Sequence, residues 1–172
     1  DYEELVSYAD GSSRARNVSV HVPQRSGRDF TVTAVEARGS GDQSDLGLKG
    51  DVELTSSDGL DLKTPEATYA SREGIVRAPG AVRFTRQRMT GSSTGMTYDR
   101  SRDVLWLLDR AVITIAPDER GEGGAHIESK TAGFARRDKY LRLDGGVRIV
   151  RGDQTIESEM ATAYLTEDEK HI

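Results

Sequence analysis

The chain has no cysteine, only 4 prolines and 6% aromatic residues among its 172 positions. The absence of cysteine excludes a disulfide framework and any zinc site built on thiolates. No apolar run approaches the roughly 20 residues that a membrane-spanning helix requires. The three histidines, His21, His126 and His171, match no zinc motif in their spacing. We therefore expect no metal site and no other cofactor.

An excess of basic residues is also lacking, since the formal net charge is -5. No basic stripe dominates any segment, which argues against nucleic acid as a partner. The sequence contains no Gly-x-Ser-x-Gly string of the kind that presents a nucleophilic serine. A pair of carboxylates for glycoside hydrolysis can still form in space from the 29 acidic residues. We expect a protein that is not an enzyme, with a glycan-processing enzyme on a β-scaffold as one alternative.

Glycine is abundant, with 18 residues spread along the chain. Such a distribution of glycine is typical of chains with many tight turns between short strands. Apolar residues make up 35% of the chain and charged residues 31%, so the chain folds around a thin core. These features predict an all-β protein.

A repeat of about 30 residues organises the chain. One landmark is a valine that follows a turn-like pair and recurs at intervals of 30, 30 and 35 residues, at Val52, Val82, Val112 and Val147. A second landmark is an aromatic residue that recurs at intervals of 29, 36 and 30 residues, at Tyr69, Tyr98, Phe134 and Tyr164. Such a period is typical of arrays in which each unit must stack on its neighbours to bury its apolar face.

Within each unit, apolar residues alternate with charged ones, as in Leu46, Leu48, Val52 and Leu54. This alternation predicts half-buried strands. Turn-forming residues at 56–59 and 151–154 divide a unit into two strands, so each unit is a hairpin. The polar residues 118–124 lengthen one unit as a loop. We predict stacked antiparallel hairpins that fold over into two facing sheets, about 10 Å apart, around an apolar interior slot.

Two parts of the chain are distinguished. Residues 1–17 are predicted to be an N-terminal segment that is partly helical, over residues 2–8, or disordered. Residues 18–172 are predicted to form a single domain. The chain begins at Asp1 without methionine and ends at Ile172 as if another strand began there, so we expect truncation at both ends.

Several segments, read in order, resemble a known family. They are LKGDVEL at 48–54, DGLDLKTPEATY at 58–69, APGAVRF at 78–84 and MTGSSTGMTYD at 89–99. Together they resemble the periplasmic LptC family of lipopolysaccharide export. Residues 127–164 are similar to the related OstA-like repeat of LptA. The resemblance covers about residues 30–166, and LptC-like, LptA-like and fused forms stay open.

The resemblance implies a β-jellyroll, also called a β-taco, in a non-enzymatic periplasmic protein. Its interior would take the lipid A acyl chains of lipopolysaccharide on their way from an inner-membrane ABC transporter towards the outer membrane. It also implies that Lpt homologues pair through their edge strands, as open edges allow. Anchored members carry an N-terminal membrane helix, so a tether to the inner membrane by a helix outside these residues stays open.

The candidate lipid-binding residues are the apolar residues expected to face the interior. They are Val52, Leu54, Leu62, Val82, Phe84, Met89, Trp106, Val112, Leu143 and Ile149. Phe84 and Met89 are favoured because aromatic and thioether side chains adapt to varied chains. Any of the ten can equally be plain core.

Two basic groups are candidates for contact with lipid phosphates, because the arginine fork suits phosphate. One is Arg136, Arg137 and Lys139, and the other is Arg86 and Arg88. Solvated loop charge is the alternative for both groups.

The main rival to a lipid-binding slot is a structural β-solenoid, such as a filament or adhesin unit, with a closed core. Solenoid interiors usually stack residues of one size. The equivalent positions here vary in volume, from Ala78 to Trp106, and this variation favours a slot that holds a ligand.

Overall fold

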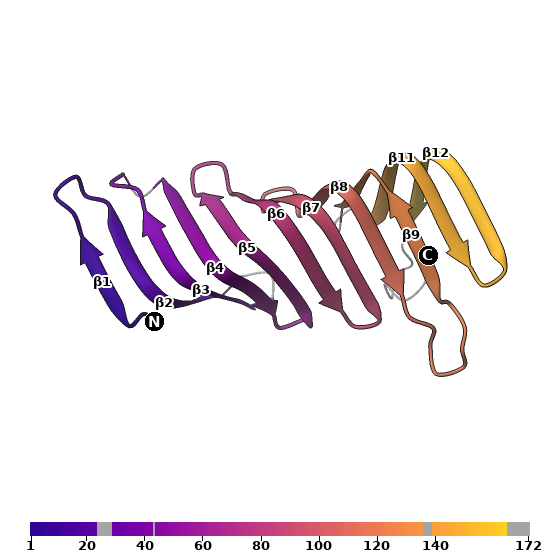
Figure 1. Ribbon diagram of the computed structural model, residues 1–172, viewed down its shortest axis with the longest axis horizontal. Helices are drawn as coiled ribbons and strands as arrows, with labels where there is room; N and C mark the ends of the chain where they lie inside the picture. Colours follow the sequence, from indigo (N-terminus) through magenta and orange to yellow (C-terminus); the bar gives the residue numbers. More distant parts are fainter. Residues whose placement is uncertain (24–28, 43, 136–138, 165–172) are drawn as a thin grey trace.

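The computed structural model describes residues 1–23, 29–42, 44–135 and 139–164, which form twelve strands and no helix (Figure 1). All twelve belong to one antiparallel sheet. The strands are β1 (Glu4–Ser7), β2 (Ser13–Pro23), β3 (Asp29–Gly39), β4 (Asp45–Ser56), β5 (Leu60–Ala70), β6 (Ile75–Arg86), β7 (Met89–Asp99), β8 (Val104–Ile115), β9 (Ala125–Ser129), β10 (Thr131–Ala135), β11 (Tyr140–Arg151) and β12 (Gln154–Tyr164).

Except at β9 and β10, strands follow one another in the sheet in chain order, so neighbouring strands form hairpins. The short strands β9 and β10 together fill one strand position between β8 and β11. β9 pairs with residues 111–115 of β8, and β10 pairs with residues 104–107. The all-β fold and the hairpin repeat are confirmed. The polar residues 118–124 lie in the β8–β9 connection, as the stretched repeat predicts.

The strands bend in their middle, and the bends line up across the sheet. Register shifts mark the bend, for example between Lys49 and Val52 in β4 and between Asp144 and Val147 in β11. Gly50 and Gly145 lie there with φ of 79° and 80°. A Cβ on Gly145 would lie 2.8 Å from the Cβ of Lys130, so conformation and space both require glycine.

The alternate strands use a hydroxyl at the same bend. Each such hydroxyl donates to the carbonyl two residues further on, over 2.8–3.2 Å, and we call these residues the bend hydroxyls: Thr64, Ser93, Ser129 and Ser158. The first three are the buried polar side chains of the described core. Local hydroxyl-to-backbone bonds of this kind compete with the regular ladder, which explains a bend at these positions.

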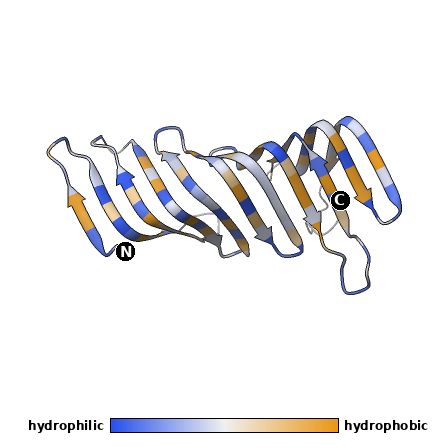
Figure 2. Cartoon of the chain, viewed as in Figure 1, coloured by the Kyte–Doolittle hydropathy of each residue, from blue (hydrophilic) through white to orange (hydrophobic). Residues whose placement is uncertain are grey.

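The bend folds the sheet so that its two halves face each other. One buried cluster contains Val82 and Ile113 from one half together with Met96, Leu107 and Leu143 from the other. Polar and apolar residues alternate along the strands (Figure 2), so one face of each half is apolar. The folded sheet resembles an open V whose apex is the line of bends.

The apex is filled by small side chains, and larger ones lie further out. Val52, Ala78, Val82, Ala111 and Val147 are all nearly fully buried next to the bends. Two sheet halves meet at an apex, where space is narrow, so only small side chains pack there without strain. This taper leaves room towards the mouth of the V.

One expectation about the architecture is wrong. Residues 2–8 do not form a helix, because β1 occupies Glu4–Ser7 and pairs with β2. The two facing layers are confirmed, and one continuous folded sheet supplies both. The division at residue 18 and the expected truncation stay predictions. Among the described residues, no helix is long and apolar enough to cross a membrane.

Candidate functional site

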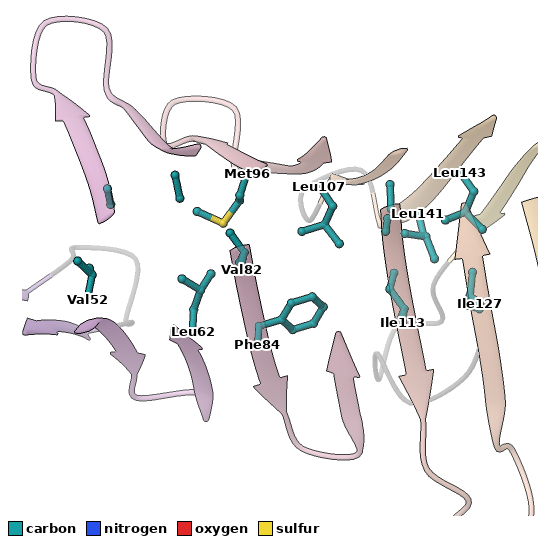
Figure 3. Packing of buried hydrophobic residues seen from close by; sticks show 14 of the residues in the cluster. Val52, Leu62, Val82, Phe84, Met96, Leu107, Ile113, Ile127, Leu141 and Leu143 are labelled. Carbon is teal, nitrogen blue, oxygen red and sulfur yellow. The ribbon is translucent and has the colours of Figure 1, made fainter. Parts of the chain in front are cut away.

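A cavity of about 140 Å³ lies between the two halves of the folded sheet. Its wall is formed by apolar side chains, with Asp58, Arg86 and Asp103 as the charged exceptions among the described residues. The apolar and aromatic lining residues are Phe30, Leu54, Leu60, Leu62, Val76, Phe84, Met89, Met96, Tyr98, Leu105, Leu107, Ile113, Ala132, Phe134 and Leu141. Figure 3 shows Leu62, Val82 and Phe84 on one half, facing Met96 and Leu107 on the other.

The open edges of the V are lined by turns, which we call the lips. The first lip contains the β4–β5, β6–β7 and β8–β9 connections, and the second contains the β3–β4, β5–β6 and β7–β8 connections. Asp58, Arg86 and Met89 lie at the first lip, and Tyr98 and Asp103 lie at the second. All five line the cavity, so the cavity extends to the mouth between the lips.

Four of the ten candidate residues line this cavity: Leu54, Leu62, Phe84 and Met89. Val52, Val82 and Leu143 are buried in the core cluster deeper in the fold, and Ile149 packs against that cluster. These four residues do not line the cavity. Their position is that of ordinary core residues, which was the alternative interpretation of the candidates.

Trp106 and Val112 do not face the interior, and this part of the prediction is wrong. Their neighbours Leu107, Ala111 and Ile113 are buried at 2–3% exposure. Because successive side chains point to opposite faces of a strand, Trp106 and Val112 lie on the outer face. The Trp106 ring covers Gly133 of β10 there, and a Cβ on that glycine would lie 2.6 Å from the ring.

The error comes from a slip of one residue in aligning the repeat. Val112 was matched with Val52, Val82 and Val147, whereas the buried residue at that level of β8 is Ala111. The bend of β8 has one residue with a positive φ, Arg110 at 50°, whereas the bends of β4 and β11 each have two, at residues 50–51 and 145–146. A slip of one residue turns every side chain of a strand to the other face.

Several lining residues were not among the candidates. Ile113 and Leu107 were missed through the same slip, and Met96 and Phe134 lie on strands after a bend hydroxyl. Along those strands, the last interior residue before the bend and the first interior residue after it are three positions apart in the sequence, as Ser93 and Met96 are. The signal that could have found them is the recurring Ser or Thr three residues before an alanine or methionine.

The Phe84 ring has a defined seat in the cavity. Phe84 pairs with Gly91 of β7, and a Cβ on that glycine would lie 2.4 Å from the ring. An aromatic ring that lies over a cross-strand glycine packs without distorting the ladder. Gly91 therefore sets how much of the cavity the ring occupies.

Charged groups occupy the mouth rather than the interior. At the first lip, Arg86 lies 3.2 Å from the carboxylate of Asp58. At the second lip, the Tyr98 hydroxyl donates to Asp103 over 2.9 Å. Arg88 faces elsewhere and donates to the carbonyl of Ala116 over 3.0 Å. Arg136 and Arg137 lie outside the described residues.

The second lip is held by acidic side chains that cap its turns. Hydroxyl donation from Ser44 and Ser40 lowers the pKa of Asp42 to about 2. The hydroxyl of Ser101 lowers the pKa of Asp99 in the β7–β8 turn in the same way. Asp42 also pairs with Arg72 of the neighbouring turn, over 3.1 Å. The serine bonds hold each turn, and the pair of Asp42 and Arg72 joins two successive turns of this lip. Within the described residues, no group of three acidic or histidine side chains could hold a metal ion.

Both the sequence and the fold of this chain are similar to those of known proteins. The sequence model of the family "Lipopolysaccharide-assembly, LptC-related" matches residues 8–116, which is more than half of the chain. The chain belongs to the LptC-related family. The match runs from β2 to β8 and ends before the segment similar to LptA.

A solved structure agrees with this assignment. The crystal structure of LptH, the periplasmic LptA homologue of Pseudomonas aeruginosa, matches with a TM-score of 0.56 and 15% sequence identity. The match covers 80% of this chain and 95% of LptH, and it establishes the shared β-jellyroll fold. A search of curated protein sequences returned no match.

Membership of the LptC-related family sets the general role. The family's members are non-enzymatic periplasmic proteins of lipopolysaccharide transport, so this chain is a component of outer-membrane biogenesis and not an enzyme. The alternatives of a glycan-processing enzyme and of a structural solenoid do not fit this family.

Proposed function

We propose that this LptC-related chain binds lipid A acyl chains in its cavity and passes lipopolysaccharide along the folded sheet between the inner and outer membranes. The observation that carries the proposal is a cavity whose described lining is apolar except for three charged residues, Asp58, Arg86 and Asp103, which lie at its mouth. Such a site fits a ligand with an apolar chain and a polar head.

The size of the cavity sets what it can hold in this closed form. A cavity of about 150 Å³ accommodates a molecule the size of benzene, with six carbons. At about 0.8 kcal/mol per methylene, six buried carbons contribute about 5 kcal/mol as an upper value. A longer acyl chain needs the two lips to move apart, or needs to continue past the ends of the sheet.

Passage between proteins requires neighbours at both ends of the sheet. β1 and β12 are the two edges, and each pairs on one side only. We propose that Lpt homologues pair with these edges, and that an inner-membrane ABC transporter complex delivers the lipid. A tether to the inner membrane by an N-terminal helix outside this chain is part of the same proposal.

The test uses two neighbouring positions on opposite faces of β8. Leu105 lines the cavity, and Trp106 lies outside. In the variant Leu105→Trp with Trp106→Phe, lipopolysaccharide is expected to shift tryptophan emission to the blue, and delipidated polysaccharide is expected to have no effect. The natural chain, with its tryptophan outside, is the matched control and stays unchanged.

Phe84→Glu, added to the reporter variant, is expected to abolish the shift because it places a charge in the cavity wall. Circular dichroism confirms that each variant is folded. An equal shift from Trp106 and from a tryptophan at position 105, or none from either, would contradict acyl binding in this cavity.

A further inference from the structure

Among the described residues that line the cavity, Arg86 carries the only positive charge. It is the last residue of β6, so it lies where the apolar wall ends and the first lip begins. Its guanidinium is 3.2 Å from the carboxylate of Asp58 in the neighbouring turn. The side chains of Arg86 and Asp58 are only 23% and 20% exposed.

Both side chains of this ion pair are less than a quarter exposed. The pair of Arg77 and Glu73, by contrast, is about half exposed and lies away from the cavity. Holding a charge beside an apolar wall costs desolvation, which the partner must offset. Two polar groups placed at the rim of an otherwise apolar site usually fix the orientation of a ligand.

The β4–β5 turn does not depend on Arg86 for its shape. Gly59 donates its backbone amide to the carbonyl of Ser56 over 3.0 Å, and Leu60 donates to the hydroxyl of the same serine over 3.2 Å. The Ser56 hydroxyl also bonds to Asp58. The turn thus retains its own bonds if Arg86 exchanges Asp58 for another anion.

We propose that Arg86 recognises the anionic headgroup of the amphiphile whose chain enters the cavity, with phosphate as the group its fork fits best. The carboxylate of Asp58 holds the guanidinium at the mouth until a phosphate replaces it. A guanidinium binds two oxygens of phosphate at once, and these bonds are stronger than neutral ones. This inference rests on the proposed binding of acyl chains in the cavity.

The opposite lip supports one orientation of the ligand. Asp103 lies at the second lip and lines the same cavity. A negative headgroup is repelled there and attracted to Arg86, so the head lies over the first lip. The arginine nearest in sequence, Arg88, bonds to the carbonyl of Ala116, which is not in the cavity wall.

The test compares amphiphiles with one chain and different heads. Dodecyl phosphate and the uncharged dodecyl maltoside are titrated into the full chain by calorimetry, below the concentration at which either forms micelles. The natural chain is expected to bind dodecyl phosphate about tenfold more tightly, as one charge-assisted contact allows. Arg86→Gln is expected to remove this preference, with a larger loss of affinity for dodecyl phosphate than for dodecyl maltoside.

Matched variants separate recognition from folding and from net charge. Arg77→Gln removes an equal charge at an exposed site and is expected to keep the tenfold preference. Asp58→Asn removes the carboxylate that competes with a phosphate and is expected to strengthen binding of dodecyl phosphate only. If Arg86→Gln does not fold by circular dichroism, Arg86→Lys retains the charge without the fork and is expected to lower the preference.

Each outcome decides between different conclusions. Equal affinity of the natural chain for the two amphiphiles would overturn the role of Arg86 and leave acyl binding intact. Binding of neither amphiphile would overturn the proposed function itself. Displacement of dodecyl phosphate by millimolar inorganic phosphate, with the same affinity as the amphiphile, would indicate a site for free phosphate and contradict the proposal.

Discussion

Single hydroxyl groups determine where this sheet bends. Each bend hydroxyl bonds to a carbonyl two residues away, and those of Thr64, Ser93 and Ser129 lie inside the core. A buried polar group that loses its partner costs about 1–3 kcal/mol. The recurrence of serine or threonine at one level of the sheet is therefore a structural requirement.

We expect Ser93→Ala to lower the free energy of unfolding by about 1–3 kcal/mol, because the carbonyl of Gly95 loses its donor. Ser93→Thr is expected to cost less, since Thr64 makes the same bond in β5. Chemical denaturation followed by circular dichroism measures both values. Ser158→Ala is the matched control, because the same bond in β12 is exposed to solvent. Equal losses at both serines would argue against a role for burial.

At the scale of the element, β8 determines which side chains form the cavity. Its interior residues include Leu105, Leu107 and Ile113, which face the cavity, whereas Trp106 and Leu108 face outwards. Apolar residues on both faces of residues 104–108 hide the alternation that other strands show. The outer residues pack over glycines, since a Cβ on Gly95 would lie 3.3 Å from Leu108.

We expect Ile113→Ala to lower the free energy of unfolding by about 2–5 kcal/mol, because a large buried side chain is removed from the interior. Val112→Ala, one residue earlier and on the outer face, is expected to cost less than half as much. Thermal and chemical denaturation give both values. A larger loss of unfolding free energy for Val112→Ala than for Ile113→Ala would mean that the side chains of β8 point to the opposite faces of the sheet from those described.

At the scale of the whole molecule, the two edges differ from the centre in exposure. In β12, Ile156, Met160 and Tyr164 are all more than half exposed. In β1, all four residues are exposed. An edge with unpaired backbone groups and exposed apolar side chains is a template for another strand. The shape of the molecule thus favours partners at its ends.

We expect a photo-cross-linking amino acid at Met160 to capture a family member, or a second copy of this chain, through that protein's N-terminal edge. Mass spectrometry of the cross-linked peptides identifies the contact. The same amino acid at Leu108 is the control, because Leu108 is 43% exposed but lies at the bend of a central strand. Cross-links of equal yield from both positions would indicate non-specific apolar contact and not edge pairing.

The periodicity of the sequence determined the fold. Alternating apolar residues and turn signals at intervals of about 30 residues encode hairpins locally, and stacking of like units follows from the need to bury one face. The position of the polar loop at 118–124 was determined in the same way, as were Leu54, Leu62, Phe84 and Met89 as lining residues.

Only the tertiary structure decided three features. Which side chains of β8 point into the interior depends on Arg110, the one residue at its bend with a positive φ. Such a change of register is not visible in composition. The difference between core and cavity depends on how closely the halves approach, which small residues at the apex control. The placement of Arg86 beside Asp58 joins residues 28 apart, and pairing of successive hairpins is what brings them together.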